Sequence, residues 1–303
     1  MKSKICSSEY VRTVSRGKSW IPAFLSLGFF LAFPVALLLV VGNWKAARYT
    51  PDQLHLLYEG LWKEKLVFTG GAITIVAAIM NSINGFSYVY SRKKVDFYHS
   101  LPVKRSRMFW NRVYTGLLYY LVPYMIMEFF AVCIGAAKGF FSLKLMELAA
   151  RLLLVHLLLY FLFYFSIVLV FCVTGNFLMG VLCLAGMQLY GPALGILMSF
   201  CAYGFFDTFS SNYPYGIFKA LEDYASPITL TAAFWQKYEA GQGAALAAVL
   251  FVLTLIFTAV SYFAYIHRPS EAAGKPMVYG KLAAVIKFMV VVPCGMGTGF
   301  VFY

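Results

Sequence analysis

The stretch "LAARLLLVHLLLYFLFYFSIVLVFCV" (residues 148–173) decides the class of fold. Its one full charge is Arg151, close to its start, and most of the rest is leucine, valine, phenylalanine and tyrosine. An α-helix needs about 20 mainly apolar residues to cross the roughly 30 Å hydrocarbon core of a bilayer. The stretch is long enough and apolar enough to do so, and it therefore predicts a membrane-spanning helix.

The composition of the whole chain points the same way. Of its 303 residues, 61% are hydrophobic and only 12% are charged, whereas a soluble domain has about 25% charged residues. A soluble core could not hide so much apolar surface from water, so we expect an integral membrane protein. The net charge of +13 would suit nucleic acid. However, the basic residues lie in short segments beside apolar runs, and we expect no nucleic-acid partner.

Seven segments are predicted to cross the membrane. The backbone of such a segment must satisfy its own hydrogen bonds in lipid, which favours helices. The sequence therefore predicts an all-α, polytopic membrane helix bundle. Residues 174–176 predict a tight turn between two spans, and Pro34, Pro123 and Pro192 predict kinks inside spans. The predicted spans are residues 21–41, 66–90, 113–137, 148–173, 177–200, 244–266 and 283–303.

The basic residues predict the orientation of the bundle. With the N-terminus in the cytoplasm, the cytoplasmic segments hold 16 Lys and Arg residues and the outer segments hold nine. An excess of Lys and Arg marks the cytoplasmic side, so we expect a cytoplasmic N-terminus. The cytoplasmic segments are then 1–20, 91–112, 174–176 and 267–287, and the outer segments are 42–65, 138–151 and 201–243.

Two of the outer segments are amphipathic. Thr50 is a candidate N-cap, Pro51 suits the first helical position and Gln53 closes a capping box. Apolar residues then recur on one helical face up to Trp62, so we expect a separate helix lying in the membrane interface. The aromatic segment 205–240 predicts short helices that dip into the outer headgroup layer, or an ordinary amphipathic loop.

The loop "SRKKVDFYHSLPVKRSRMFWNR" (91–112) holds seven of the 25 basic residues. Between its two basic runs lies "VDFYHSLPV", an apolar and aromatic patch that membrane topology alone does not require. Pro102 favours a helix break followed by a restart, so we expect a short helix at the membrane surface. Two interpretations remain open: a signal for topology and lipid headgroups, or an element that docks on a soluble partner.

This loop resembles the coupling loop of type-2 ABC transporter permeases. It is most similar to a group of long bacterial permeases in which the loop reads much like "RKVDFYHSLPVKR". The segment "YIHRPSEAAGKPM" (265–277) resembles a second segment of that group. The resemblance implies a non-enzymatic permease subunit in a bacterial plasma membrane, which exports its substrate together with a second permease subunit. A separate ABC ATPase subunit would bind the ATP, so we expect no cofactor in this chain.

The resemblance also implies how the chain is organised. Residues 1–19 would form an amphipathic elbow, and residues 20–266 a six-span permease domain with the coupling loop 91–112 and an outer re-entrant region 205–240. Residues 267–303 would add a cytoplasmic loop and a seventh span. Because relatives of the group continue well beyond that span, we expect the chain to be a fragment or a short variant.

The same resemblance assigns the residues of the coupling surface. Its apolar and aromatic side chains would fill a groove of the ATPase, and its basic side chains would lie against anionic lipid headgroups. The residues of this surface are Arg92, Lys93, Lys94, Asp96, Phe97, Tyr98, Leu101, Pro102, Lys104 and Arg105.

No nucleotide site is expected in the chain itself. "GKS" at 17–19 lacks the first glycine of a phosphate-binding loop, because that position is Arg12. Gly295, Gly297 and Gly299 lie in an apolar span, where small residues more often permit close contact between helices. The six cysteines lack metal-ligand spacing and are interpreted as small apolar side chains, so we expect no metal site.

Four polar residues inside predicted spans are candidates for a substrate pathway. Glu128 lies in mid-span, where a carboxylate is costly unless it faces protein or a wet cavity, and it could pair with His156 or Arg151. Asn81 and Asn84 are one turn apart and suit bonds between helices. All four either hold the bundle together or line a pathway. The alternative functions are an intramembrane enzyme built on Glu128 and His156, and a non-transporting sensor or scaffold with the same fold.

Overall fold

The computed structural model describes residues 20–44, 50–206 and 216–302, and within these ranges the chain is helical without a strand. Seven helical segments there are long and apolar enough to cross a membrane, and each contains or overlaps one of the predicted spans. The all-α, multi-pass membrane bundle is confirmed. The segments are Trp20–Gly42, Pro51–Tyr90, Arg105–Ala137, Leu143–Val173, Phe177–Phe205, Ala244–Ile266 and Gly280–Gly299.

The described chain divides into two compact units. The first unit holds the described residues up to 87 together with 97–168, and the second holds 88–96 and the described residues from 169 onward. The chain passes from one unit to the other at Ser87, within the short helix α6 (Arg92–Ser100) and within the long helix α8 (Leu143–Val173).

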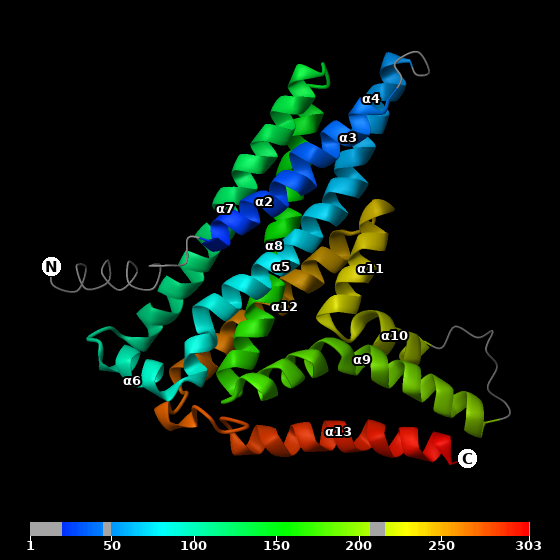
Figure 1. The fold of residues 1–303 in the computed structure, drawn as a ribbon. Coiled ribbons are helices and arrows are strands. Elements are labelled where there is room, and N and C mark those ends of the chain that lie inside the picture. Colours follow the sequence, from blue (N-terminus) through cyan, green and yellow to red (C-terminus); the bar gives the residue numbers. More distant parts are fainter. Residues whose placement is uncertain (1–19, 45–49, 207–215, 303) are drawn as a thin grey trace. The chain divides into compact units, whose positions relative to one another are not determined.

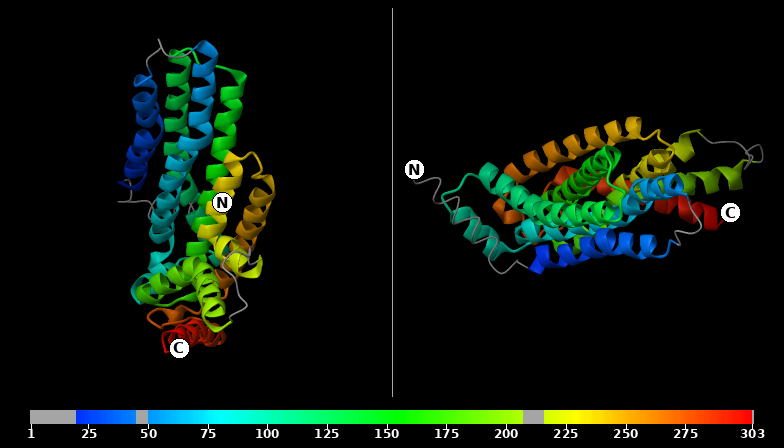
Figure 2. Two further views of the ribbon diagram at one scale, coloured as in Figure 1. Left: turned by 90° about the vertical axis from the view of Figure 1, so that its right-hand side faces the viewer. Right: turned by 90° about the horizontal axis from the view of Figure 1, so that it is seen from above.

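In the first unit, α2 lies along α5 and α7 (Figures 1 and 2). A π-helical turn around Pro34 joins α2 to α3, so the predicted irregularity at this proline is present. The elements are α2 (Trp20–Phe30), η1 (Leu31–Val35), α3 (Ala36–Gly42), α4 (Pro51–Gly60), η3 (Leu61–Lys65), α5 (Leu66–Phe86), α7 (Arg105–Ala137) and the larger part of α8.

The predicted N-cap at Thr50 is confirmed, but the predicted end of that helix is wrong. The Thr50 hydroxyl accepts a bond from the Gln53 amide and the Gln53 side chain accepts one from the Thr50 amide. The helix then continues through the π-helical turn η3 into α5 instead of ending near residue 62. Lysine and glutamate favour helices, so the charged residues 63–65 interrupt the apolar pattern without ending the helix.

Aromatic rings fill the core of the first unit. Tyr120 stacks on Tyr160 with 4.2 Å between ring centroids, and both side chains are fully buried. Phe29 makes T-shaped contacts with the rings of Tyr120 and Tyr124. Glycine makes room for these rings, because a Cβ at Gly70 would overlap the rings of His156 and Phe33.

The second unit contains the helices that follow the predicted turn at 174–176. That turn is confirmed, and the Asn176 side chain caps the next helix by accepting a 3.1 Å bond from the Leu178 amide. Helix α13 lies beside α9 (Figure 1). The elements are η4 (Ser87–Tyr90), which begins one residue before the unit, α9 (Phe177–Phe205), α10 (Gly216–Tyr224), α11 (Pro227–Glu239), α12 (Ala244–Ile266), η5 (Ser270–Ala272) and α13 (Gly280–Val301).

Short helices are confirmed in the described part of 205–240. Helix α10 packs closely on α9, because a Cβ at Gly191 would overlap Ala225 and one at Gly195 would crowd Glu222. The sequence predicts close contact between helices at the glycines of α13. The structure does not show it, since a Cβ at Gly295 would meet open space among the described residues. The predicted elbow at 1–19 lies outside the described residues.

Candidate functional site

The loop between the second and third spans folds as the sequence predicts. Residues Arg92–Ser100 form helix α6, a bend follows at residues 101–103, and α7 begins at Arg105 (Figure 1). Pro102 has no backbone N–H to continue the helix, and the Ser100 hydroxyl closes its end with a 2.8 Å bond to the Phe97 carbonyl. The break and restart at Pro102 are therefore confirmed.

Part of the apolar patch of this loop packs within its own unit. Tyr98, Leu101 and Val103 pack against the buried side chain of Met108. The guanidinium of Arg112 lies over the ring of Tyr98, 4.6 Å from its centroid. Arg112 is itself buried and donates a hydrogen bond to the Gly85 carbonyl oxygen near the end of α5. Sequence reasoning assigned Tyr98 and Leu101 to a partner groove and did not foresee these intramolecular contacts.

The opposite side of α6 faces outward. Phe97 is 54% exposed, although its ring touches the edge of Tyr98. Lys93 and Lys94 are exposed one helical turn earlier, at the spacing that places side chains on the same face of a helix. Arg92, Asp96, Pro102 and Lys104 are also exposed, and Arg105 is half-buried. The exposed face of α6 thus carries an aromatic ring one helical turn after two lysines.

In the second unit, a buried arginine lies just after α12. Arg268 is only 6% exposed, and this burial lowers the pKa of its guanidinium from the usual value. Arginine nevertheless stays protonated in proteins and offers five N–H donors. Here it donates to carbonyl oxygens of Phe171 at 2.9 Å, Cys172 at 2.7 Å, Thr174 at 2.8 Å and Val89 at 3.2 Å.

These acceptors explain why a charge is tolerated there. The last four carbonyl groups of a helix have no partner inside that helix, and a buried carbonyl without a hydrogen bond is costly. Arg268 satisfies such groups at the end of α8 and also binds the carbonyl of Val89 in η4. The segment 268–278, which we call the clasp, is thereby fixed at its first residue.

Backbone bonds fix the rest of the clasp. The Gly274 amide donates to the Gly175 carbonyl at 2.7 Å, and the Val278 amide donates to the Val173 carbonyl at 2.9 Å. Gly274 has a φ of +89°, in the region that favours glycine. A Cβ at Gly175 would overlap carbonyl oxygens of the clasp. The clasp therefore lies tightly against the turn between α8 and α9.

The clasp also holds the start of α6. The Arg92 side chain donates a 3.0 Å bond to the Ala273 carbonyl oxygen. The hydroxyl groups of Tyr88 and Tyr265 lie 2.5 Å apart, and those of Tyr90 and Thr174 lie 2.8 Å apart. Arg92, at the start of the first segment that carries the sequence resemblance, thus contacts the second segment, 265–277, inside the second unit. Sequence reasoning missed the role of Arg268, whose one signal is a lone arginine directly after an apolar span.

The candidate pathway residues have different surroundings. His156 Nε2 lies 2.9 Å from the Val67 carbonyl oxygen, and its Nδ1 lies 2.9 Å from the Tyr124 hydroxyl. A carbonyl only accepts, so Nε2 carries the proton and Nδ1 accepts from Tyr124. Asn81 donates to the Gly116 carbonyl at 3.0 Å and to the Tyr160 hydroxyl at 3.3 Å, which confirms its predicted role between helices.

The pairing considered for Glu128 does not form. Glu128 is buried, and its Oε1 atom has no hydrogen-bond partner among the described residues. Both ring nitrogens of His156 are engaged elsewhere, and Arg151 pairs with Glu147 one helical turn before it on α8. Asn84, one turn from Asn81, is half-buried.

The described ranges hold no group of three or more His, Cys, Asp or Glu side chains arranged to bind a metal ion. The five cysteines within them, from Cys133 to Cys294, are free thiols. Cys6 and the "GKS" stretch at 17–19 lie outside the described residues.

Comparison of the chain with models of protein families, with curated proteins and with solved structures found no match. The described residues form seven helices that are long and apolar enough to cross a membrane, which indicates a multi-pass membrane protein. Its function has to be argued from α6, the clasp and the side chains inside the bundle.

Proposed function

We propose that this chain is the membrane-spanning permease subunit of an ABC transporter and that it docks on a separate ATPase subunit through α6. The observation that carries the proposal is Phe97, a large apolar side chain that is 54% exposed on a short helix between two candidate spans. The resemblance of residues 91–112 and 265–277 to type-2 ABC permeases supplies the class of partner.

Topology alone explains the cations of this loop but not Phe97. The positive-inside rule requires only Lys and Arg near the ends of spans. Residues 95, 98 and 101 of the same apolar patch are buried or half-buried, whereas Phe97 stays outward beside Lys93 and Lys94. Aromatic side chains that fill a partner's pocket carry much of the binding energy of protein interfaces. Phe97 is therefore the proposed anchor of the docking surface.

The contacts that hold α6 in place would transmit movement of a partner to the spans. In the first unit, Tyr98 contacts Arg112 on α7, and Arg112 bonds to the end of α5. In the second unit, Arg92 bonds to the clasp, which leads to α8, α9 and α12. Force applied at the exposed face of α6 by ATP-driven movement of the partner would reach spans through these bonded contacts.

The wider setting follows from the resemblance and the charges. The chain would form half of a pathway, with a second permease subunit as the other half, in a bacterial plasma membrane. The excess of Lys and Arg in segments such as 91–112 favours a cytoplasmic N-terminus and a cytoplasmic α6. Glu128, His156, Asn81 and Asn84 are candidate residues of the pathway, and export is the proposed direction.

Co-purification from native membranes tests the proposal. The chain would be isolated in mild detergent as wild type, as Phe97→Ala and as Phe141→Ala, and the bound proteins identified by mass spectrometry. Phe141 is 60% exposed in the turn at the far end of α7 and is a matched control. We expect a soluble ATPase with wild type and with Phe141→Ala, and its loss with Phe97→Ala. An ATPase that remains with Phe97→Ala, or one absent from every sample, overturns the proposal.

A second measurement separates a permease from a sensor. With the ATPase bound, a transported compound raises ATP turnover and accumulates across a sealed vesicle. A sensor or scaffold with the same fold would keep the partner without moving any compound. Screening amphiphilic compounds in vesicles that contain both subunits distinguishes these outcomes.

A further inference from the structure

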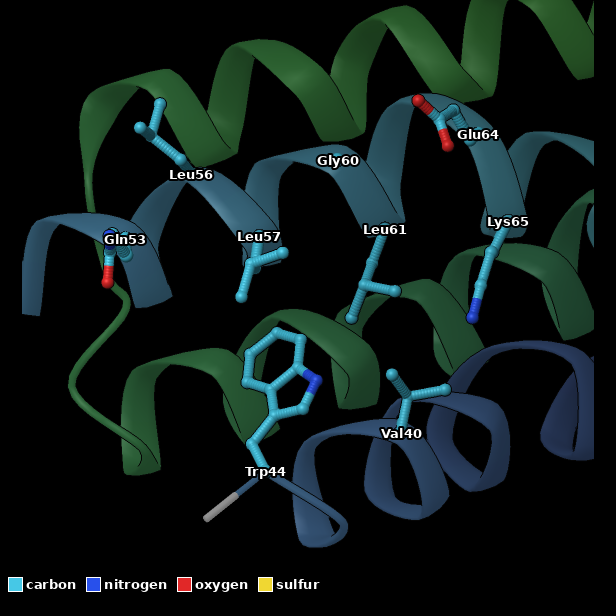
Figure 3. Close-up of a pocket in the computed structure, with 9 residues that line it drawn as sticks. All are labelled: Val40, Trp44, Gln53, Leu56, Leu57, Gly60, Leu61, Glu64 and Lys65. Carbon is cyan, nitrogen blue, oxygen red and sulfur yellow. The ribbon is translucent and has the colours of Figure 1, made fainter. Parts of the chain in front are cut away.

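A groove runs between α3 and the α4–η3 segment in the first unit. Its wider part has a volume of about 590 Å³, and its walls come from Val40 and Trp44 on one side and Leu57 and Leu61 on the other (Figure 3). This volume lies in the range of sites that hold small molecules, about 300–1,000 Å³.

A second cavity of about 290 Å³ continues the groove along α3 and α5. The two cavities share Val40, Leu61, Glu64 and Lys65, so they adjoin each other at η3 and are treated as two parts of one groove. The walls of the smaller cavity are otherwise mostly apolar and include Ala36, Leu37, Leu66 and Phe68. One part of the groove is thus suited to hydrocarbon, and the other, which also touches Gln53, is more mixed.

Lys65 lies where the two cavities adjoin, and among the described residues its ammonium group forms no ion pair. Lys65 points from η3 toward Val40 across the groove, whereas the Glu64 side chain points to the other side of its helix (Figure 3). The ion pairs of the described residues lie elsewhere, at Lys144–Glu59 and Arg151–Glu147. An ammonium group beside an apolar wall is complementary to a ligand that combines a negative charge with a hydrocarbon chain.

Lys65 lies at the depth in the membrane at which lipid headgroups are expected. Val40, opposite Lys65, lies two residues before the end of the first span at Gly42. The ends of spans lie in the headgroup layer, where Trp side chains such as Trp44 are favoured and basic residues attract phosphate. The smaller apolar cavity continues from Lys65 along the body of the span, toward hydrocarbon.

We propose that this groove binds one anionic glycerophospholipid from the surrounding bilayer. An acyl chain lies in the cavity lined by Ala36, Leu37 and Phe68, and the phosphate binds the Lys65 ammonium. The rest of the headgroup occupies the wider cavity between Trp44 and Gln53. No residue of α6 lines either cavity, and the site does not depend on the proposed ATPase docking.

Native mass spectrometry of the purified full chain tests this site. Phosphatidylglycerol and phosphatidylcholine with the same acyl chains are titrated onto wild type, Lys65→Gln and Lys63→Gln. Lys63 is an exposed lysine of the same π-helical turn that lines neither cavity. A basic residue near an anionic lipid surface contributes about 1 kcal/mol, which is about fivefold in affinity.

We expect wild type to retain one phosphatidylglycerol in preference to phosphatidylcholine, and Lys65→Gln to lower that affinity about fivefold. Lys63→Gln should leave it within about twofold of wild type. Equal binding of the two lipids, or equal effects of the two substitutions, overturns the proposal. Val40→Trp adds a second check, because Val40 lines both cavities, so a larger side chain there fills the groove without changing charge and should also reduce phosphatidylglycerol binding. Unchanged binding with Val40→Trp would contradict the assigned groove.

Discussion

Arg268 and Val89 are 179 positions apart in the chain, yet the guanidinium of Arg268 donates a 3.2 Å hydrogen bond to the Val89 carbonyl oxygen. Val89 lies three residues before α6 begins at Arg92. The same guanidinium binds two carbonyl groups in the last turn of α8 and that of Thr174 directly after it. The buried side chain of Arg268 thus fixes the point in the second unit from which the candidate docking helix begins, so Arg268 is a positioning residue.

Replacing Arg268 with methionine should destabilise the protein strongly. Methionine keeps an unbranched side chain but donates no hydrogen bond, so four carbonyl oxygens lose the guanidinium. Because buried unsatisfied polar groups cost about 1–3 kcal/mol, we expect the free energy of unfolding to fall by roughly 3 kcal/mol. Arg151→Met is the control, since its exposed ion pair with Glu147 contributes at most about 0.5 kcal/mol. Thermal unfolding in detergent measures both, and equal stability of the two variants contradicts the role of Arg268.

Gly175 should not tolerate alanine. A Cβ at this position would overlap the carbonyl oxygens of Ala272 and Lys275 in the clasp, and added volume in a packed site costs about 1–3 kcal/mol. Gly186→Ala is the matched change in α9, where a Cβ meets open space among the described residues. Alanine favours a helix over glycine by about 0.8–1 kcal/mol. We expect Gly175→Ala to melt earlier than wild type and Gly186→Ala to melt no earlier.

The Tyr124 hydroxyl and the His156 ring should be energetically coupled. The 2.9 Å bond between them joins α7 to α8 inside the first unit. A double-mutant cycle with Tyr124→Phe and His156→Phe isolates that bond from the packing of either ring. Hydrogen bonds between membrane helices average about 0.6 kcal/mol in such cycles, and we expect a coupling energy of that size. Additive effects of the two substitutions would show that the bond contributes nothing to stability.

Phe97 and Tyr98 are neighbours with opposite expected phenotypes. Tyr98 packs on Met108 and under Arg112, so Tyr98→Ala should lower the free energy of unfolding by about 1–3 kcal/mol. Phe97 is exposed, so Phe97→Ala should change stability by less than about 0.5 kcal/mol. The two variants would be compared by thermal unfolding and by retention of a bound ATPase. A loss of stability with Phe97→Ala equal to that with Tyr98→Ala would make Phe97 a packing residue rather than a docking one.

The spans were predictable because length and hydropathy decide them locally. The segment 244–266 matches α12 at both ends, since Gly243 and His267 flank an uninterrupted apolar run. The break at Pro102 and the cap at Thr50 were predictable for the same reason, because each depends on the chemistry of adjacent residues.

The errors occur where the local pattern is ambiguous. The charged residues 63–65 look like the boundary of a span, but they also favour helix, and the structure continues through them as η3. The contacts that hold α6 in place join residues far apart in the sequence, and no local pattern contains them. Nothing near Arg268 in the sequence points to the carbonyl groups of Val89 or Phe171, and nothing near Tyr98 predicts that Arg112 covers its ring.

The continuous helix from Pro51 to Phe86 inside the first unit has a mechanical consequence. At about 1.5 Å per residue, the 10, 5 and 21 residues of α4, η3 and α5 make a rod roughly 54 Å long, beyond the thickness of a bilayer of about 40–45 Å. Such a rod acts as a lever, because a tilt of about 5° at one end swings the other end by roughly 5 Å. The far tip is braced by the 4.7 Å ring stack of Tyr58 on Phe140 and the 2.6 Å ion pair of Glu59 with Lys144. A small rotation at the Phe86 end of this rod would therefore be amplified into a displacement of that whole braced tip.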